Sequence, residues 1–141
     1  MLQFYSPEAL KNGIVINPFV CLERFYTVSN NTFNRALQEV KNGKIEGHWM
    51  WWTFPQMKGL GKSERSFFYG LSGQIEAYAY INDSILGPRL VEICQAVLDS
   101  DKTVYEIFGD DAIKVYSCCK LFAAVSPEPV FHKLIERYMW H

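Results

Sequence analysis

A run of aromatic side chains at residues 48–56, His-Trp-Met-Trp-Trp-Thr-Phe-Pro-Gln, is the segment whose residue types point most directly to a binding site. Three of the four tryptophans of the chain lie within it, at Trp49, Trp51 and Trp52. Each indole offers a flat apolar face and one N–H donor, which suits stacking on a planar ligand such as a nucleobase or nicotinamide. The same run would also suit an irregular core segment whose rings fill the space between helices.

Polar residues stand at both ends of this run. His48 opens it, Gln56 closes it, and Phe54 precedes Gln56 by two positions. We expect Phe54 to extend an aromatic wall and Gln56 to read a polar edge of the ligand. His48 is a further ligand-binding candidate, although a structural histidine is the more common case and no arrangement of His, Cys and Asp resembles a nucleophilic triad.

A glycine turn, Gly-Leu-Gly-Lys-Ser, follows at residues 59–63. Its glycine spacing does not fit a P-loop, which also needs a buried strand before it and a long helix after it, so we exclude that motif. The turn still exposes backbone N–H groups, and Lys62, Ser63 and Arg65 add donors that suit a phosphate. A tight turn with solvated charges explains the same residues equally well.

An acidic residue, Glu76, interrupts the otherwise apolar helical pattern of residues 75–81. Apolar surroundings disfavour the charged form of a carboxyl group, which is the condition that a general acid needs. Tyr80 lies one turn later on the same side and is placed to hydrogen-bond to it. In the alternative interpretation, Glu76 faces solvent or pairs with an arginine as a structural anchor.

A second set of polar residues interrupts an apolar helix that begins near Asp110. Lys114, Ser117 and Lys120 recur at three-residue spacing and therefore lie along one side of that helix. The side faces either solvent or a polar cavity.

Composition and charge limit the classes of function. The chain has 141 residues, is 49% hydrophobic and carries a net charge of −1, which fits one domain over residues 1–141 with a substantial core. A general nucleic-acid binder or a membrane-surface binder needs a basic field that this chain lacks. No apolar run is long enough to span a bilayer. A pocket for one nucleotide needs only one or two local cations.

The four cysteines, Cys21, Cys94, Cys118 and Cys119, stand in helical patterns. We expect them to be reduced, mostly buried small hydrophobes of a cytoplasmic protein. The first five residues lack the basic start and apolar stretch of a signal peptide, which agrees with that location. No paired Cys or His spacing suits zinc, so we expect no metal site. The sequence also implies no tightly bound cofactor.

Helical spacing recurs over most of the sequence, but not between Gly43 and Ser72. In that interval, 50–54 and 66–71 could form short strands. The sequence therefore predicts a mainly α, single-domain irregular helical bundle around an aromatic-rich loop, with one or two short strands. The helices are expected to start at Asn17-Pro18, break at Ser29-Asn30-Asn31, end at Gly43, and resume over 73–81, 84–100, 103–108, 110–125 and from Ser126 onward.

Taken together, these motifs resemble an uncharacterised bacterial family, domain of unknown function 1810. The resemblance covers nearly the whole chain, and the 48–56 run is its most specific part. Departures from the family pattern fall at Val28-Ser29, Ile45-Glu46 and Cys118-Cys119. Other matching pieces are Leu22-Glu23-Arg24-Phe25, Gly59-Leu60-Gly61, Tyr69-Gly70, Glu76-Ala77, Leu86-Gly87, Arg89-Leu90, Ile107-Phe108-Gly109 and Leu121-Phe122.

That family looks distantly similar to the NADAR group, a mainly helical fold tied to NAD and ADP-ribose metabolism. Members of the group remove ADP-ribose from modified guanine bases or cleave N-glycosidic bonds. Their signature is an aromatic-Pro pair, then Glu-His on a helix, then a catalytic lysine. Phe54-Pro55 and Glu76-Ala77 follow the same order here, but Ala77 replaces the histidine and no lysine follows soon after, so Lys62 or Lys114 would have to replace it.

The resemblance implies an enzyme that cleaves an N-glycosidic bond in an ADP-ribose-type or related nucleotide ligand. Glu76 would be its general acid or base, and Trp49, Trp51, Trp52 and Tyr69 would stack the base. The alternative is a non-catalytic module of the same fold that binds a nucleotide or a peptide. A scaffold whose aromatic run is only core is a third interpretation, and the oligomeric state stays open.

Overall fold

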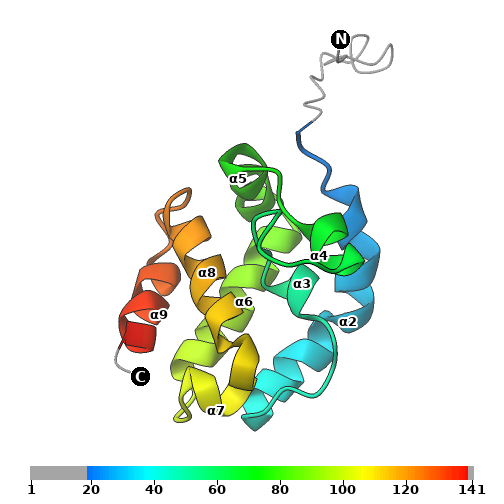
Figure 1. The fold of residues 1–141 in the computed structure, drawn as a ribbon. Helices are drawn as coiled ribbons and strands as arrows, with labels where there is room; N and C mark the ends of the chain where they lie inside the picture. The colour runs from blue at the N-terminus through cyan, green and yellow to red at the C-terminus, as the bar shows by residue number, and fades with distance from the viewer. Residues whose placement is uncertain (1–18, 140–141) are drawn as a thin grey trace, which may run out of the picture.

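Helix α2, Glu23–Asn42, is the first helix in the computed structural model, which describes residues 19–139 (Figure 1). Its apolar side chains recur at helical spacing, and Phe25 and Ala36 on that face are buried. Gly43 ends the helix with a φ of 89°, a left-handed conformation that glycine adopts without a Cβ penalty. The expected end at Gly43 is therefore confirmed, whereas the expected start at Asn17-Pro18 lies outside the described residues.

The expected break at residues 29–31 is wrong, because α2 runs through it as one 20-residue helix. Arg89 donates to Ser29 Oγ and to Asn30 Oδ1, each at 2.8 Å. These side chains therefore have a distant partner and do not compete for the helix backbone. The tertiary contact overrides the local preference of the polar cluster.

Four further helices complete the bundle around a shared core (Figure 1). Helix α6 packs against α2, α5 and α9, and α8 packs against α5 and α9. Phe122 links three of them, since its ring centroid lies 5.6 Å from that of Tyr80 and 5.7 Å from that of Phe131. The bounds are α5 Gln74–Asn82, α6 Leu86–Asp99, α8 Ala112–Ala123 and α9 Pro129–Met139.

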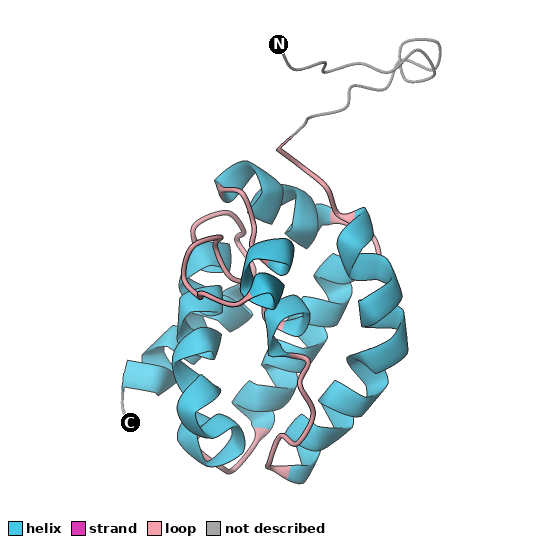
Figure 2. Cartoon of the chain, turned by 45° about the vertical axis from the view of Figure 1, so that its right-hand side comes forward, coloured by secondary structure: helices cyan, strands magenta, loops and turns pink. Residues whose placement is uncertain are grey.

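Short helices form where strands were expected. Residues Met50–Thr53 are helix α3 and Glu64–Tyr69 are helix α4. In the described part of the chain, an isolated parallel bridge between Met57 and Leu71 takes the place of a sheet. Figure 2 accordingly draws the segment around this bridge as loop and short helix.

Near the other end of the bundle, α7 spans Val104–Phe108. Thr103 caps α7 and forms a capping box with Glu106. The short helical turn predicted at 103–108 is therefore confirmed. A 3₁₀ turn, Gly109–Asp111, then leads into α8. The helices expected over 73–81, 84–100 and 110–125 are confirmed with shifts of a few residues at their ends.

The cysteines differ from one another in exposure. Cys94, Cys118 and Cys119 are unpaired and buried, as expected, but Cys21 is exposed. Among residues 19–139, no helix combines the length and the apolar character that crossing a membrane requires.

Candidate functional site

Most of the aromatic run packs into the core rather than lining a ligand site. Trp49 is 2% exposed and donates its Nε1–H to Glu39 Oε1 at 3.0 Å. Trp52 is 9% exposed and donates to Thr32 Oγ1 at 2.9 Å. Phe54 is fully buried. The expected role of these three rings as a stacking wall is wrong, since their faces are covered and both indole N–H groups already have partners.

A buried carboxylate, Glu39, anchors the start of this run. Its oxygens accept hydrogen bonds from the backbone N–H of Glu46 at 2.7 Å and of Gly47 at 2.9 Å, and from Trp49 and Arg35 at 3.0 Å each. Burial raises the pKa of Glu39, but these hydrogen bonds outweigh it and lower the pKa below its ordinary value. The sequence analysis missed Glu39. The signal that could have found it is an acidic side chain within the apolar stripe of α2, which indicates a buried carboxylate with hydrogen-bond partners.

Trp51 differs from its neighbours because its ring is only half-buried. It borders a pocket of about 130 Å³ together with His48, Arg65, Asp111 and Lys114, and we refer to this site as the Trp51 pocket. The Nζ atom of Lys114 lies 4.8 Å from the Trp51 ring centroid and 2.6 Å from Asp111 Oδ1. Four of the predicted site residues, from three separate parts of the sequence, therefore meet here.

The walls of the Trp51 pocket are set by close packing. A Cβ atom at Gly61 would lie 2.6 Å from Trp51 Cη2, so only glycine lets the 59–63 turn approach the indole this closely. Arg65 reaches over the core, with its guanidinium carbon 5.5 Å from the Trp52 ring centroid. The buried Trp52 ring thus supports the exposed Arg65 guanidinium at the edge of the pocket.

Other residues of the glycine turn have structural roles or lie outside the pocket. Ser63 caps α4, since its Oγ accepts a hydrogen bond from the Ser66 backbone N–H at 3.0 Å. Its expected role in holding a phosphate is therefore not supported. Lys62 is exposed and is not among the residues that line the Trp51 pocket.

Gln56 is buried and connects the aromatic segment to α8. Its Nε2 donates to the carbonyl oxygens of Phe54 at 2.9 Å and Lys114 at 2.7 Å. Its expected role in reading a ligand edge is wrong, because both amide protons are used within the protein. The same contacts hold the backbone of Lys114 beside the run.

Two tyrosines that we expected at the site do not border the Trp51 pocket. Tyr80 is buried and donates to the carbonyl oxygen of Trp52 at 3.3 Å, so it does not bond to Glu76 as predicted. Burial strongly raises the pKa of Tyr80. Tyr69 is half-buried, and its ring centroid lies 5.1 Å from that of Trp52 and 5.9 Å from that of Phe25.

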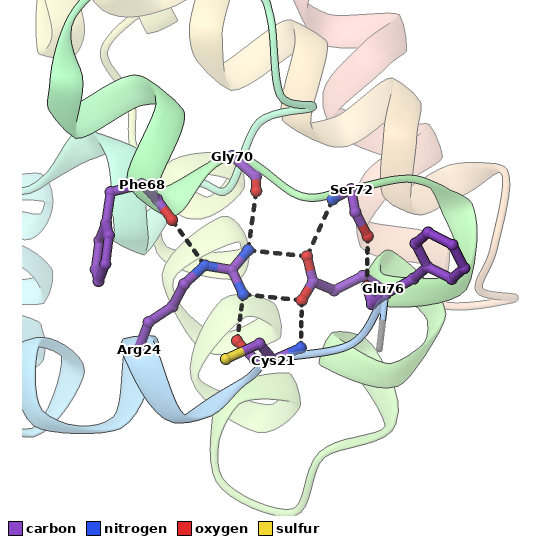
Figure 3. A network of polar contacts seen from close by, with 7 residues as sticks. Cys21, Arg24, Phe68, Gly70, Ser72 and Glu76 are labelled. Carbon is purple, nitrogen blue, oxygen red and sulfur yellow. Dashed lines mark hydrogen bonds and ion pairs between the residues drawn. The ribbon is translucent and has the colours of Figure 1, made fainter. Parts of the chain in front are cut away.

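Glu76 forms a fully hydrogen-bonded ion pair with Arg24 (Figure 3). Arg24 donates from both terminal nitrogens, each at 2.8 Å, and the backbone N–H groups of Cys21 and Ser72 donate at 2.6 and 3.0 Å. The remaining guanidinium protons reach the carbonyl oxygens of Cys21, Phe68 and Gly70. All five donors of the guanidinium are therefore used.

This environment opposes the expected role of Glu76 as a general acid. Burial of the carboxylate, which is 2% exposed, raises its pKa, but the hydrogen bonds from Arg24, Cys21 and Ser72 lower it below its ordinary value. A general acid needs a raised pKa and access to the ligand. The arginine-anchor interpretation of Glu76 accounts for the geometry.

A cavity of about 310 Å³ lies beside the ion pair, bordered by Phe19, Lys58 and Phe68. Its floor is formed by Arg24 and Glu76, whose polar atoms already bond to one another and to backbone groups. A ligand here would find one uncommitted cation, Lys58, among the charged groups that border it. In the Trp51 pocket Lys114 is paired with Asp111, but Arg65 and His48 take part in none of the ion pairs of the described residues and border a half-buried indole, so this pocket is the stronger candidate.

The described fold and site define a mainly helical protein with a polar, aromatic-edged pocket beside a packed aromatic core. The chain belongs to the DUF1810 family, described as a protein of unknown function, which matches residues 20–140. The crystal structure of the conserved hypothetical protein Rv1873 from Mycobacterium tuberculosis is similar. The identity is 36%, the match covers 88% of this chain and 90% of that chain, and the TM-score is 0.83. No curated protein matches the chain.

The resemblance to domain of unknown function 1810 is thus confirmed. The distant similarity to the NADAR group stays a prediction, and so do the activity and the ligand inferred from it.

Proposed function

We propose that the Trp51 pocket binds the anionic group of a nucleotide-type small molecule, with ADP-ribose as the first candidate. The observation that carries the proposal is the half-buried Trp51 indole beside His48, Arg65 and Lys114. Arginine and lysine are the usual partners of phosphate oxygens, and the accessible part of the half-buried indole can contact a planar base.

The size of the pocket restricts how such a ligand would bind. Its volume of about 130 Å³ is well below the roughly 300 to 1,000 Å³ of pockets that enclose a drug-sized molecule. It suits one phosphate or carboxylate group, while the rest of the ligand would extend along the surface near the 59–63 turn. The exposed Lys62 on that turn would then meet a second charged group.

Binding without catalysis is the interpretation that the contacts favour. Glu76 and Gln56 are bonded internally, and the carboxylate that borders the Trp51 pocket is Asp111. Cleavage of an N-glycosidic bond is the second candidate. Asp111 is the observation that favours it, since a carboxylate there would activate water as a general base.

The experiment is a calorimetric and fluorescence titration of the protein with ADP-ribose, NAD and AMP. We expect Lys114→Gln and Arg65→Gln each to weaken binding about 10- to 100-fold, since a charge-assisted hydrogen bond contributes about 1.5 to 3 kcal/mol. Lys133→Gln removes the same charge from an exposed position on α9 and serves as the matched control. It should bind like the wild type.

The outcomes separate the candidates. Saturable binding without release of the base supports a binding module, whereas turnover that Asp111→Asn abolishes with affinity kept supports the enzyme. If none of the three ligands binds saturably, or if the control weakens binding as much as Lys114→Gln, the proposal is wrong. We further propose a cytoplasmic location, in which the three buried cysteines stay reduced.

A further inference from the structure

A second, larger depression follows the outer side of α6. It has a volume of about 780 Å³ and is bordered by the end of α5, by α6 and by residues 126–128 before α9. It shares no lining residue with the Trp51 pocket. We refer to it as the α6 groove. Its apolar lining residues are Ile81, Gly87, Pro88, Val91, Ala96 and Pro127.

The α6 groove has the length and spacing of a helix-binding site. Its lining residues on α6 recur every three or four positions from Pro88 through Val91 and Gln95 to Asp99, which is a stripe about 16 Å long at 1.5 Å per residue. A docked helix places anchors with the same spacing into such a groove. Ala96 is small and partly exposed, so a partner backbone can approach closely there.

Charge identifies the kind of helix that would fit. Glu92, Asp99 and Glu128 border the α6 groove, against one cation, Lys41. The ion pairs found within the described part of the chain involve none of these carboxylates. Asp99 accepts a hydrogen bond from Gln95, at 2.8 Å, but its charge stays unbalanced. The border is therefore acidic around an apolar floor.

We propose that the α6 groove docks an amphipathic helix of a partner protein, with an apolar face on the floor and lysine or arginine side chains against the acidic border. Complementary charges of this kind select the partner and orient it, while the apolar contacts supply most of the affinity. The interaction does not depend on the ligand proposed for the Trp51 pocket.

The test uses a synthetic fluorescein-labelled helix of about 18 residues, ~27 Å long, with leucine on one face and lysine beside it. A second peptide carries glutamate in place of lysine. We expect anisotropy at about 0.15 M salt to show saturable binding of the lysine peptide and at least about tenfold weaker binding of the glutamate peptide.

Variants place the contact on the groove. Ala96→Trp fills the floor and should weaken the lysine peptide at least about tenfold, and Gln95→Trp is a second blocking variant from an exposed position, in case Ala96→Trp fails to fold. Thr27→Trp, at an exposed site on α2, is the control for an added indole.

Charge variants test the border separately. Glu92→Gln with Glu128→Gln should weaken the lysine peptide, whereas Glu23→Gln with Glu46→Gln removes the same charge from exposed sites that do not border the groove and should not.

Three results would overturn the proposal: no saturable binding of the lysine peptide, equal affinity for both peptides, or blocking variants that bind like the Thr27→Trp control. Analytical ultracentrifugation supplies a fourth. If the wild type is a dimer and the blocking variants are monomers, the occupant is a second copy of this chain and not a partner helix.

Discussion

Replacing Glu76 by glutamine will destabilise the fold. In the native protein its carboxylate accepts four hydrogen bonds, two from Arg24 and one each from the Cys21 and Ser72 backbone N–H groups. Glutamine has one acceptor oxygen and a donor NH₂ group in its place. The NH₂ group would face N–H donors. The substitution would also leave the buried guanidinium of Arg24 without its counter-charge.

The expected cost is about 3 to 5 kcal/mol, the range found when one partner of a buried ion pair is removed. Unfolding entropy is about 2.1 cal/mol/K per residue, which for 141 residues is ~0.3 kcal/mol/K. The melting temperature should therefore fall by about 10 to 17 °C. Arg24→Met combined with Glu76→Met should recover part of this loss, because no buried charge is then left unpaired.

The pH dependence has a defined sign. Because the folded-state pKa of Glu76 lies below its ordinary value of 4.5, the carboxylate adds stability above that value. This contribution is lost as the pH falls through the lowered folded-state pKa. The difference in stability between wild type and Glu76→Gln should therefore be largest near neutral pH and shrink in acid.

Urea unfolding followed by circular dichroism between pH 3 and pH 7, with linear extrapolation to zero denaturant, measures both effects. A loss smaller than about 1 kcal/mol at pH 7, or a difference that grows in acid, would contradict the ion-pair account. Loss of an N-glycosidic activity with unchanged stability would restore Glu76 as a catalytic residue.

Three other substitutions test the framework by the same urea unfolding measurement. Glu39→Gln should cost about 1 to 3 kcal/mol, because the amide oxygen can still accept the three N–H groups that bond to Oε1 but carries no charge, and the NH₂ group replaces Oε2 opposite Arg35 Nε. Gly87→Ala should cost about 3 kcal/mol, because the added Cβ would lie 2.1 Å from the carbonyl oxygen of Ile81. Gly73→Ala is the control, since a Cβ at Gly73 meets nothing within 4 Å. Thr103→Ala should cost about 1 kcal/mol by removing the cap of α7. A Gly73→Ala loss as large as that of Gly87→Ala would refute the packing argument.

Local signals in the sequence predicted much of the fold. The end of α2 at Gly43 and the short helix after Thr103 both depend on residues within one helical turn of each other. Such preferences can be read without knowing the tertiary structure. The mainly helical bundle around an aromatic cluster follows from them.

Long-range contacts account for what the sequence did not show. The break expected near Ser29 fails because Arg89, 60 residues away, supplies a partner. The role of Glu76 depends on Arg24, 52 residues earlier, and periodicity alone left open whether such a partner exists. Residues His48, Arg65 and Lys114 were each candidates, but only the fold brings them to one pocket beside Trp51.

Two buried carboxylates explain why the aromatic run can be both core and site. Glu39 binds the backbone before α3, and Glu76 binds Ser72 at the far end of the same irregular segment. With both ends held, Trp49 and Trp52 can be buried at fixed positions while Trp51, between them, faces the pocket. A motif of three tryptophans therefore does not need three ligand contacts.

Trp51→Ala should lower ligand affinity while leaving most of the stability. Trp49→Ala should leave ligand affinity largely unchanged and lower the unfolding free energy by about 3 to 5 kcal/mol. Equal effects of the two substitutions on ligand titration and urea unfolding would show that this division of roles is wrong.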